Sequence, residues 1–212
     1  MTTPKIDWLN ELRLGHAAGR DVDGLVNGLP PKERALLTKT WVFDARADQL
    51  PPDGDWLTWL ILGGRGAGKT RAGAEFVRHQ ARAAGGPIAL VGETYSDVRE
   101  VMIEGESGIL EAYPYFQRPT WIPSRRRIEF PTGVIAQAFS SEDPEALRGP
   151  QFAAAWSDEL GKWRNAEATW DMLQFGLRLG TEPRQMVTTT PRPTALLKRL
   201  IADPDTIVTH AT

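Results

Sequence analysis

The stretch that most constrains the fold runs from Leu60 to Phe76 and reads "LILGGRGAGKTRAGAEF". Gly63, Gly68, Lys69 and Thr70 occupy every fixed position of the pattern G-x-x-x-x-G-K-[ST]. The apolar run "WLTWLILG" before the loop predicts a buried strand, and "KTRAGAEFVRHQARAA" after it predicts a helix. A glycine-rich turn from a strand into a helix indicates an α/β fold.

The residue types of this loop predict a cradle for phosphate groups. Glycines let the backbone curl so that successive N–H groups point at an anion, and the following helix adds the positive end of its dipole. Lys69 would place a point charge on the phosphates, and the Thr70 hydroxyl is a hard oxygen ligand suited to Mg²⁺. We therefore expect nucleotide contacts from eight consecutive residues, which are Gly63, Gly64, Arg65, Gly66, Ala67, Gly68, Lys69 and Thr70.

Strand and helix patterns alternate along the rest of the chain. Strands are predicted at "PIALVGE", "FAAAWSDE", "RQMVTTTP" and "TIVTHAT", with helical material from the first of these to about Tyr113. "NAEATWDMLQFGLRLG" predicts a helix capped by Asn165 and ended by Gly180, and "PTALLKRLIA" predicts another. This order favours a mainly parallel central sheet flanked by helices on both faces. Two alternating runs within residues 125–139 predict an antiparallel hairpin at its edge.

The region before the loop has a different character. Residues 5–40 predict one or two amphipathic helices, and residues 44–55 are a turn-rich connector. We expect residues 1–50 to form a helical segment and connector packed on the core, and residues 51–212 to form the phosphate-loop domain.

Composition excludes several classes of protein. The chain has 212 residues, 41% of them hydrophobic and 25% charged, with a net charge of −2. This is a soluble globular composition that gives no support to wholesale nucleic-acid binding, although a local basic patch remains compatible with it. The absence of cysteine excludes a disulfide scaffold, a cysteine nucleophile and cysteine-ligated zinc. No transmembrane helix or signal peptide is expected.

An acidic pair, Asp158-Glu159, follows the apolar run of "FAAAWSDELGKW". The carboxyl ends of parallel strands are where open α/β sheets bind ligands. We expect Asp158 to hold Mg²⁺, through water, and Glu159 to take a proton from an attacking water as general base. Because neighbouring strand residues face opposite sides, separate roles for the two are expected. A solvated acidic pair that opens a loop is the alternative.

The segment "VTTTPRP", Val187 to Pro193, predicts a third strand end. Thr189 and Thr190 would be placed to hydrogen-bond to Glu159, to water or to a γ-phosphate. The alternative is that β-branched residues merely favour a strand that the prolines end. Since no N-K-x-D signature for guanine is present, ATP is the expected nucleotide.

Four motifs together resemble a known family. "WLILGGRGAGKTRAGAEF", "FSSEDPEALRGPQF", "WSDELGKW" and "TTTPRP", in that order, are similar to the large terminase subunit, the DNA-packaging motor of tailed bacteriophages and phage-like gene transfer agents. The resemblance spans about Gln49 to Leu200. It implies a P-loop ATPase of the additional-strand, catalytic-glutamate type that works with ATP and Mg²⁺. It also implies a pentameric ring that docks on a capsid portal protein, moves double-stranded DNA and cooperates with a small terminase subunit in the bacterial cytoplasm.

The resemblance also implies roles for matched residues. Asp158 and Glu159 match the metal-binding acid and the catalytic glutamate, and Thr188 to Pro191, which include Thr190, match the motif that couples hydrolysis to movement. Gln49 lies where the family places an adenine-contacting segment.

Two arginines carry further implied roles. Arg65 matches a loop arginine typical of the family, for which we expect a nucleotide-contacting and catalytic role; a salt bridge that braces the loop is the alternative. Arg148 matches an arginine that reaches the neighbouring subunit's nucleotide. A permanently charged planar fork suits charge on a transferring phosphoryl group. An ordinary surface ion pair with Glu142 or Glu145 is the alternative for Arg148.

The chain departs from the family pattern in one respect. Large terminases carry a second, nuclease domain, and this sequence stops at Thr212, so we expect an isolated ATPase domain without nuclease activity. The run Arg125-Arg126-Arg127 is a candidate DNA contact, with a solvated or subunit-facing charge run as the alternative. Two other functions stay open. One is a helicase-like DNA-dependent ATPase, and the other is a nucleotide switch with negligible turnover.

Overall fold

The computed structural model describes residues 27–41, 44–83 and 85–211, which fall into two compact units, Met1–Thr40 and Trp41–Thr212. In the first unit, helix α3 spans Pro31–Thr38, with a proline at its first position, where no N–H donor is needed. The helices predicted within residues 5–26 lie outside the described residues.

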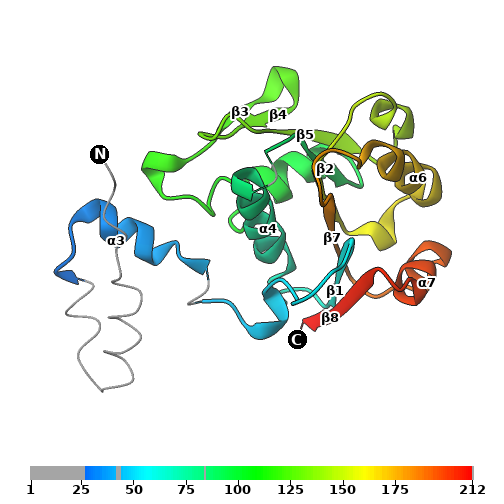
Figure 1. Cartoon of the computed structure of the whole chain (residues 1–212), viewed down its shortest axis with the longest axis horizontal. Helices are drawn as coiled ribbons and strands as arrows, with labels where there is room; N and C mark the ends of the chain where they lie inside the picture. The colour runs from blue at the N-terminus through cyan, green and yellow to red at the C-terminus, as the bar shows by residue number, and fades with distance from the viewer. Residues whose placement is uncertain (1–26, 42–43, 84, 212) are drawn as a thin grey trace. The chain divides into compact units, whose positions relative to one another are not determined.

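The second unit is built on one eight-stranded sheet in the order β3-β4-β5-β2-β6-β7-β1-β8 (Figure 1). The six strands from β5 to β8 pair in parallel, and β3, β4 and β5 pair antiparallel. The predicted hairpin at the sheet edge is thus confirmed, and one short strand, β3, extends it. The strands span Thr58–Gly63 (β1), Ile88–Gly92 (β2), Thr120–Ile122 (β3), Arg127–Glu129 (β4), Ile135–Ser140 (β5), Ala154–Asp158 (β6), Arg184–Thr189 (β7) and Thr206–Ala211 (β8).

Strand β7 lies between β1, which leads into the phosphate loop, and β6, which ends in the acidic pair. The register pairs Asp158 with Thr188 and Leu62 with Thr189, so the carboxyl ends of the three strands meet at one edge. The predicted P-loop fold of the additional-strand type is confirmed. This edge brings together motifs that are about 90 and 30 residues apart in the sequence.

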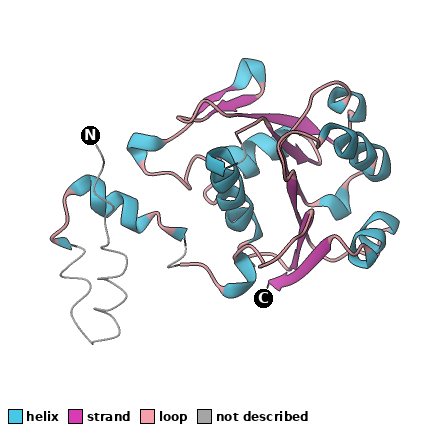
Figure 2. Ribbon diagram, viewed as in Figure 1, coloured by secondary structure: helices cyan, strands magenta, loops and turns pink. Residues whose placement is uncertain are grey.

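Helices cover both faces of the sheet (Figure 2). The α-helices of this unit are α4 (Lys69–Ala83), α5 (Tyr95–Asp97), α6 (Ala166–Gly176) and α7 (Ala195–Ala202). Short helical turns, η2 to η7, span Ala47–Gln49, Val98–Ile103, Tyr115–Gln117, Pro123–Arg125, Pro144–Leu147 and Leu160–Lys162. Among the described helices, none is both long and apolar enough to cross a membrane.

The core forms two apolar clusters, because the side chains of each strand alternate between the faces. Trp59 and Ile61 of β1 belong to the cluster that includes residues of α4, whereas Leu60 and Leu62 belong to the cluster that includes residues of α6 and α7. All four are buried, so β1 is covered on both sides. A continuous apolar run is therefore needed just before the phosphate loop.

Two helix predictions were wrong in detail. Helix α6 ends at Gly176 rather than Gly180, because the Phe152 N–H donates to the Gly176 carbonyl and the Phe152 carbonyl accepts N–H groups from Arg178 and Leu179. The backbone thus leaves the helix to pair beside β6. The Asn165 side chain does not cap α6 but donates to the carbonyls of Ser141 and Glu142.

The helical material predicted up to Tyr113 is shorter than expected. It consists of α5 and the π-helix η3, which ends at Ile103, and turns follow to Tyr113. Thr94 starts this segment with a reciprocal cap, because its hydroxyl accepts the Asp97 N–H while Asp97 accepts the Thr94 N–H.

Candidate active site

The phosphate loop turns from β1 into α4 through two glycines in the left-handed region. Gly66 has φ of 76° and Gly68 has φ of 73°, which residues with a side chain rarely adopt. Gly63 is required for a different reason, because a Cβ there would lie 2.8 Å from the carbonyl oxygen of Ala211 on β8. The loop pattern therefore follows from the backbone path as well as from phosphate chemistry.

Lys69, the first residue of α4, is folded back onto the loop. Its ammonium donates to the carbonyl oxygens of Gly63 at 2.9 Å and Gly64 at 2.7 Å. The same nitrogen lies 3.7 Å from Glu159 Oε1, and the Lys69 side chain is buried. Three anionic or partly negative groups thus hold this cation at the sheet edge.

The connector before β1 is bound to the underside of the loop. The Gln49 amide, which is buried, donates to the Gly68 carbonyl at 3.2 Å and accepts the Arg46 N–H at 3.1 Å. The Arg46 guanidinium donates to the Ala67 carbonyl at 2.8 Å and pairs with Asp48 at 3.0 Å. Gln49 therefore lies against the phosphate loop. The sequence analysis missed Arg46, which has no motif around it and lies 21 residues from its partner.

Asp158, the last residue of β6, is buried and held by one strong hydrogen bond. Its Oδ1 accepts the hydroxyl of Thr188 at 2.6 Å. Burial raises the pKa of Asp158 from 3.8 to about 6, and the charge of Glu159 adds to this effect, while the Thr188 hydrogen bond and the Lys69 charge oppose it. The side chain is thus a carboxylate with few partners, suited to a cation.

Glu159 follows β6 rather than belonging to it. Its φ is 48° and its ψ is 41°, a left-handed conformation that is unfavourable for a residue with a side chain. The prediction that strand alternation separates the two carboxylates was therefore wrong, because this turn takes Glu159 out of the strand. The Glu159 carboxylate accepts the Thr190 hydroxyl at 3.2 Å and the Thr190 N–H at 3.4 Å. Lys162 lies 3.7 Å from its other oxygen.

The two predicted threonines behave differently. The contact from Thr190 to Glu159 is confirmed. Thr189 instead accepts the N–H of Gly161 at 2.9 Å and donates to the Thr190 carbonyl at 3.1 Å. Thr189 thus ties β7 to the turn after Glu159 and braces the carboxylate indirectly.

The donor set fits Mg²⁺. Thr70, half-buried in the first turn of α4, offers a hydroxyl, and Asp158 offers a carboxylate. Within residues 27–41, 44–83 and 85–211, no group of three or more His, Cys, Asp or Glu side chains is placed to hold a metal ion. Mg²⁺ commonly takes one or two protein oxygens and completes its shell with water and phosphate oxygens, so this sparse set suits it.

The two candidate catalytic arginines lie on the surface. Arg65 is exposed and makes no hydrogen bond or ion pair with any residue that the structure describes, so the bracing salt bridge is not formed here. Arg148 is 75% exposed and lies 3.3 Å from the Glu145 carboxylate. This ion pair is the alternative considered for Arg148, and the single chain does not bring its guanidinium to the phosphate loop.

Two of the three consecutive arginines are engaged within the chain. Arg126, which is left-handed, lies over the Tyr95 ring at 3.8 Å, and Arg127 pairs with Glu129. Arg125 is exposed. The run is therefore partly a structural feature of the hairpin.

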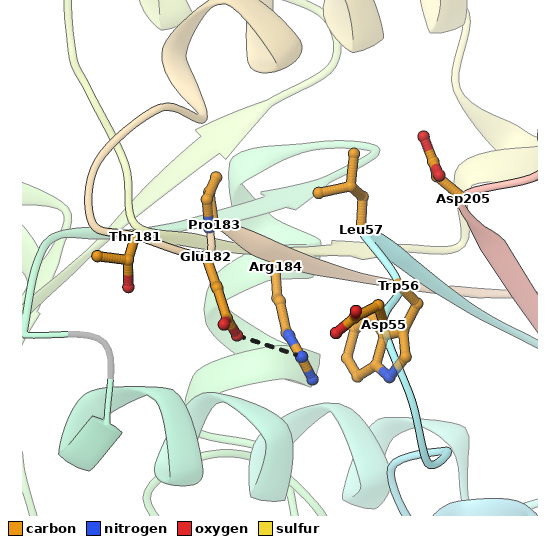
Figure 3. A pocket seen from close by; sticks show the side chains of 8 residues that line it. All are labelled: Asp55, Trp56, Leu57, Thr181, Glu182, Pro183, Arg184 and Asp205. Carbon is orange, nitrogen blue, oxygen red and sulfur yellow. Dashed lines mark hydrogen bonds and ion pairs between the residues drawn. The ribbon is translucent and has the colours of Figure 1, made fainter.

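A pocket of about 310 Å³ lies at the opposite edge, where β1, β7 and β8 begin (Figure 3). In it the Arg184 guanidinium points toward Glu182, at 3.4 Å, and lies 4.6 Å from the centre of the Trp56 ring. The amino ends of parallel strands are not where α/β sheets bind nucleotides. The lining residues are Asp55, Trp56, Leu57, Thr181, Glu182, Pro183, Arg184 and Asp205.

Comparisons with known proteins agree with this geometry. The sequence model of the family described as "Terminase large subunit, T4likevirus-type, N-terminal" matches residues 60–204. No match was found among curated protein sequences.

Three solved structures illustrate the likeness in fold. The ATPase domain of the Thermus phage P74-26 large terminase has a TM-score of 0.59 and 14% identity, over 79% of this chain and 80% of that one. The large terminase of a second thermophilic bacteriophage, solved in complex with ADP, has a TM-score of 0.63 and 16% identity over 84% of this chain and 44% of that one. The N-terminal domain of the bacteriophage phi29 DNA packaging ATPase has a TM-score of 0.54 and 15% identity, over 74% and 90%.

Proposed function

The chain belongs to the family of terminase large subunits, through its N-terminal region, and we propose that it is an ATP-hydrolysing motor domain that powers translocation of double-stranded DNA into a capsid. One observation carries the proposal. The phosphate-loop cation Lys69, the carboxylate of Asp158 and the carboxylate of Glu159 come from three different segments and converge on one sheet edge.

The binding step uses the loop. Backbone N–H groups at the start of α4 and the ammonium of Lys69 would hold the phosphates of ATP. Thr70 and Asp158 would hold Mg²⁺, which supplies charge neutralisation on the phosphate oxygens when bound. The large terminase of the second thermophilic bacteriophage, solved in complex with ADP and with ATP-γ-S, supports a nucleotide of this class.

The hydrolysis step uses Glu159. Its carboxylate would accept a proton from the attacking water, and the hydrogen bonds from Thr190 would fix its direction. When phosphates draw Lys69 away, Glu159 loses one of its two cations and becomes a freer base. Loss of the γ-phosphate would be felt through Thr190 at the end of β7, which gives a route from hydrolysis to movement.

Assembly would complete the site. An Arg148 that is 75% exposed and far from its own phosphate loop in the chain is suited to act on a neighbouring subunit. Arg65 would contact the γ-phosphate from within the subunit, and Gln49 would contact the adenine. We propose a homo-oligomeric, pentameric ring that acts with a capsid portal protein and a small terminase subunit, in the bacterial cytoplasm and transiently at the portal.

The proposal is tested by ATP hydrolysis measured against protein concentration, with and without double-stranded DNA. A motor whose sites are completed between subunits gives a rate that rises more steeply than the protein concentration and rises further with double-stranded DNA. Stimulation by single-stranded DNA alone would indicate a helicase-like ATPase. ATP binding without turnover at any concentration, with or without DNA, would indicate a nucleotide switch and contradict the proposal.

A further inference from the structure

Trp156 lies where the three elements of the site meet. It is fully buried on β6, two residues before Asp158, and its indole N–H donates to the Thr188 hydroxyl on β7 at 2.8 Å. Its ring also packs directly on helix α4, because a Cβ at Gly73 would lie 2.1 Å from indole Cε2. One side chain therefore touches the helix of the phosphate loop and a threonine of the third strand end.

The hydrogen bonds at Thr188 have a fixed direction. An indole N–H can only donate, whereas a hydroxyl has one proton to give and can accept two. Because Trp156 donates to Thr188, the hydroxyl proton of Thr188 is left for a different acceptor. Asp158 Oδ1 is 2.6 Å away and the Ser157 carbonyl is 3.4 Å away, so the shorter bond, to the carboxylate, receives the proton.

We infer that Trp156 is a positioning residue of this site, which orients the Asp158 carboxylate by directing the Thr188 proton onto it. The inference rests on the proposed function, in which Asp158 holds Mg²⁺. Outer partners that fix the orientation of a metal ligand contribute strongly to metal affinity. Without the indole N–H, the Thr188 hydroxyl is free to rotate toward the Ser157 carbonyl, and Asp158 loses its one side-chain hydrogen bond.

Gly73 supports the inference independently. A glycine in the middle of a helix is unfavourable compared with alanine, so helix stability does not explain its presence in α4. The close approach of the Trp156 ring does explain it. The indole is thus seated by the helix backbone as well as by β6, which limits the orientations from which its N–H can donate.

The same sheet contains a matched control. Trp59 on β1 is also buried, and its indole N–H donates to the Thr209 hydroxyl on the paired strand β8 at 3.0 Å. Among the described residues, the Thr209 hydroxyl is not bonded to a carboxylate. Trp59→Phe and Trp156→Phe therefore remove the same kind of hydrogen bond from the same sheet, and only Trp156→Phe removes one that leads to Asp158.

The test compares the Kd of ATP-γ-S with and without Mg²⁺, and takes the ratio of the two as the contribution of the metal. Trp156→Phe is expected to reduce this ratio by about tenfold, while leaving the Kd without Mg²⁺ unchanged. Trp59→Phe is expected to leave the ratio as in the wild type. If Trp156→Phe does not fold, 3-benzothienylalanine at position 156 keeps the ring shape, lacks the N–H and is expected to give the same reduction.

Thr188→Val tests the route. It should reduce the ratio by itself, and adding Trp156→Phe should reduce it no further, because both act through one hydroxyl. An unchanged ratio in Trp156→Phe, an equal loss in Trp59→Phe, or full additivity with Thr188→Val would overturn the inference. Asp158→Asn separates two failures. If Asp158→Asn keeps the wild-type ratio, the proposed metal ligand is wrong; if it lowers the ratio and Trp156→Phe does not, the inference alone is wrong.

Discussion

The ammonium of Lys69 lies 3.7 Å from Oε1 of Glu159, so the cation of the phosphate loop is paired with the carboxylate proposed as general base. The two residues are 90 positions apart in the sequence, and the pair exists because β7 alone separates β1 from β6. Binding of phosphates and activation of water are therefore linked through one ion pair. A phosphate that draws Lys69 away also changes the charge around Glu159.

Lys69→Ala is expected to weaken ATP binding at least about tenfold, because it removes a charged hydrogen-bond donor from the phosphates. Isothermal titration with ATP measures this change. Lys162→Ala is the matched control, since Lys162 also lies 3.7 Å from the Glu159 carboxylate but is outside the loop. Equal losses in the two variants would show that charge near Glu159, rather than the loop lysine, governs ATP binding.

Arg65→Ala is expected to lower ATP turnover while leaving the free energy of unfolding within about 0.5 kcal/mol of the wild type, because exposed Arg65 has no partner in the described chain. Arg46→Ala provides the contrast, since its guanidinium donates to Ala67 in the same loop and its loss should lower stability. Chemical denaturation and a phosphate-release assay separate the two. A loss of stability in Arg65→Ala equal to that in Arg46→Ala would identify Arg65 as a brace.

Arg148→Ala is expected to leave ATP binding by the monomer unchanged and to remove the steep dependence of turnover on protein concentration. Glu145→Ala is the control, because it breaks the same 3.3 Å ion pair and keeps the arginine. Exposed ion pairs contribute little to stability, so neither variant should unfold. Weaker ATP binding by the Arg148→Ala monomer would contradict action on a neighbouring subunit.

The pKa of Asp158 predicts how stability depends on pH. Its folded value is raised to about 6 from 3.8, chiefly by burial, so between these values the unfolded chain releases a proton that the folded chain keeps. The free energy of unfolding should therefore fall as pH rises through this window, by about 3 kcal/mol, and be flat above it for this group. Glu159 and Lys69 are the neighbouring charges that act on the carboxyl in this range.

Asp158→Asn should remove this slope, because the amide does not titrate but still accepts the Thr188 hydroxyl. Urea denaturation without Mg²⁺, at intervals across the window, measures the effect. The same slope in wild type and Asp158→Asn would show that another group causes it.

Much of the fold was predictable because its signals are local. The apolar run of β1, the glycines of the loop and the alternation of strands and helices follow from backbone geometry and from burial on both faces. The boundaries of α6 were not predictable, because a long-range backbone contact with Phe152 ends the helix at Gly176 before the local stop signal at Gly180 is reached. The left-handed turn at Glu159 is equally invisible in the sequence, since it has no glycine to mark it.

The site itself was predictable where residues carry a motif and not where they act through contacts. Lys69, Asp158 and Thr190 were each named by the strand end they occupy. Arg46 and Trp156 were missed, because one is a connector residue and the other reads as an ordinary strand tryptophan. Only the strand order and the packing on α4 reveal that they reach the site.

The central claim is that Glu159 turns ATP binding into ATP hydrolysis, and a single-turnover measurement with protein in excess over ATP tests it most directly. In the presence of Mg²⁺, Glu159→Gln keeps the shape of the side chain and its contacts with Thr190 but cannot accept the proton of water. We predict that this variant binds ATP at least as tightly as the wild type and releases the γ-phosphate at least about 100-fold more slowly. Release at the wild-type rate from fully bound Glu159→Gln would contradict the account.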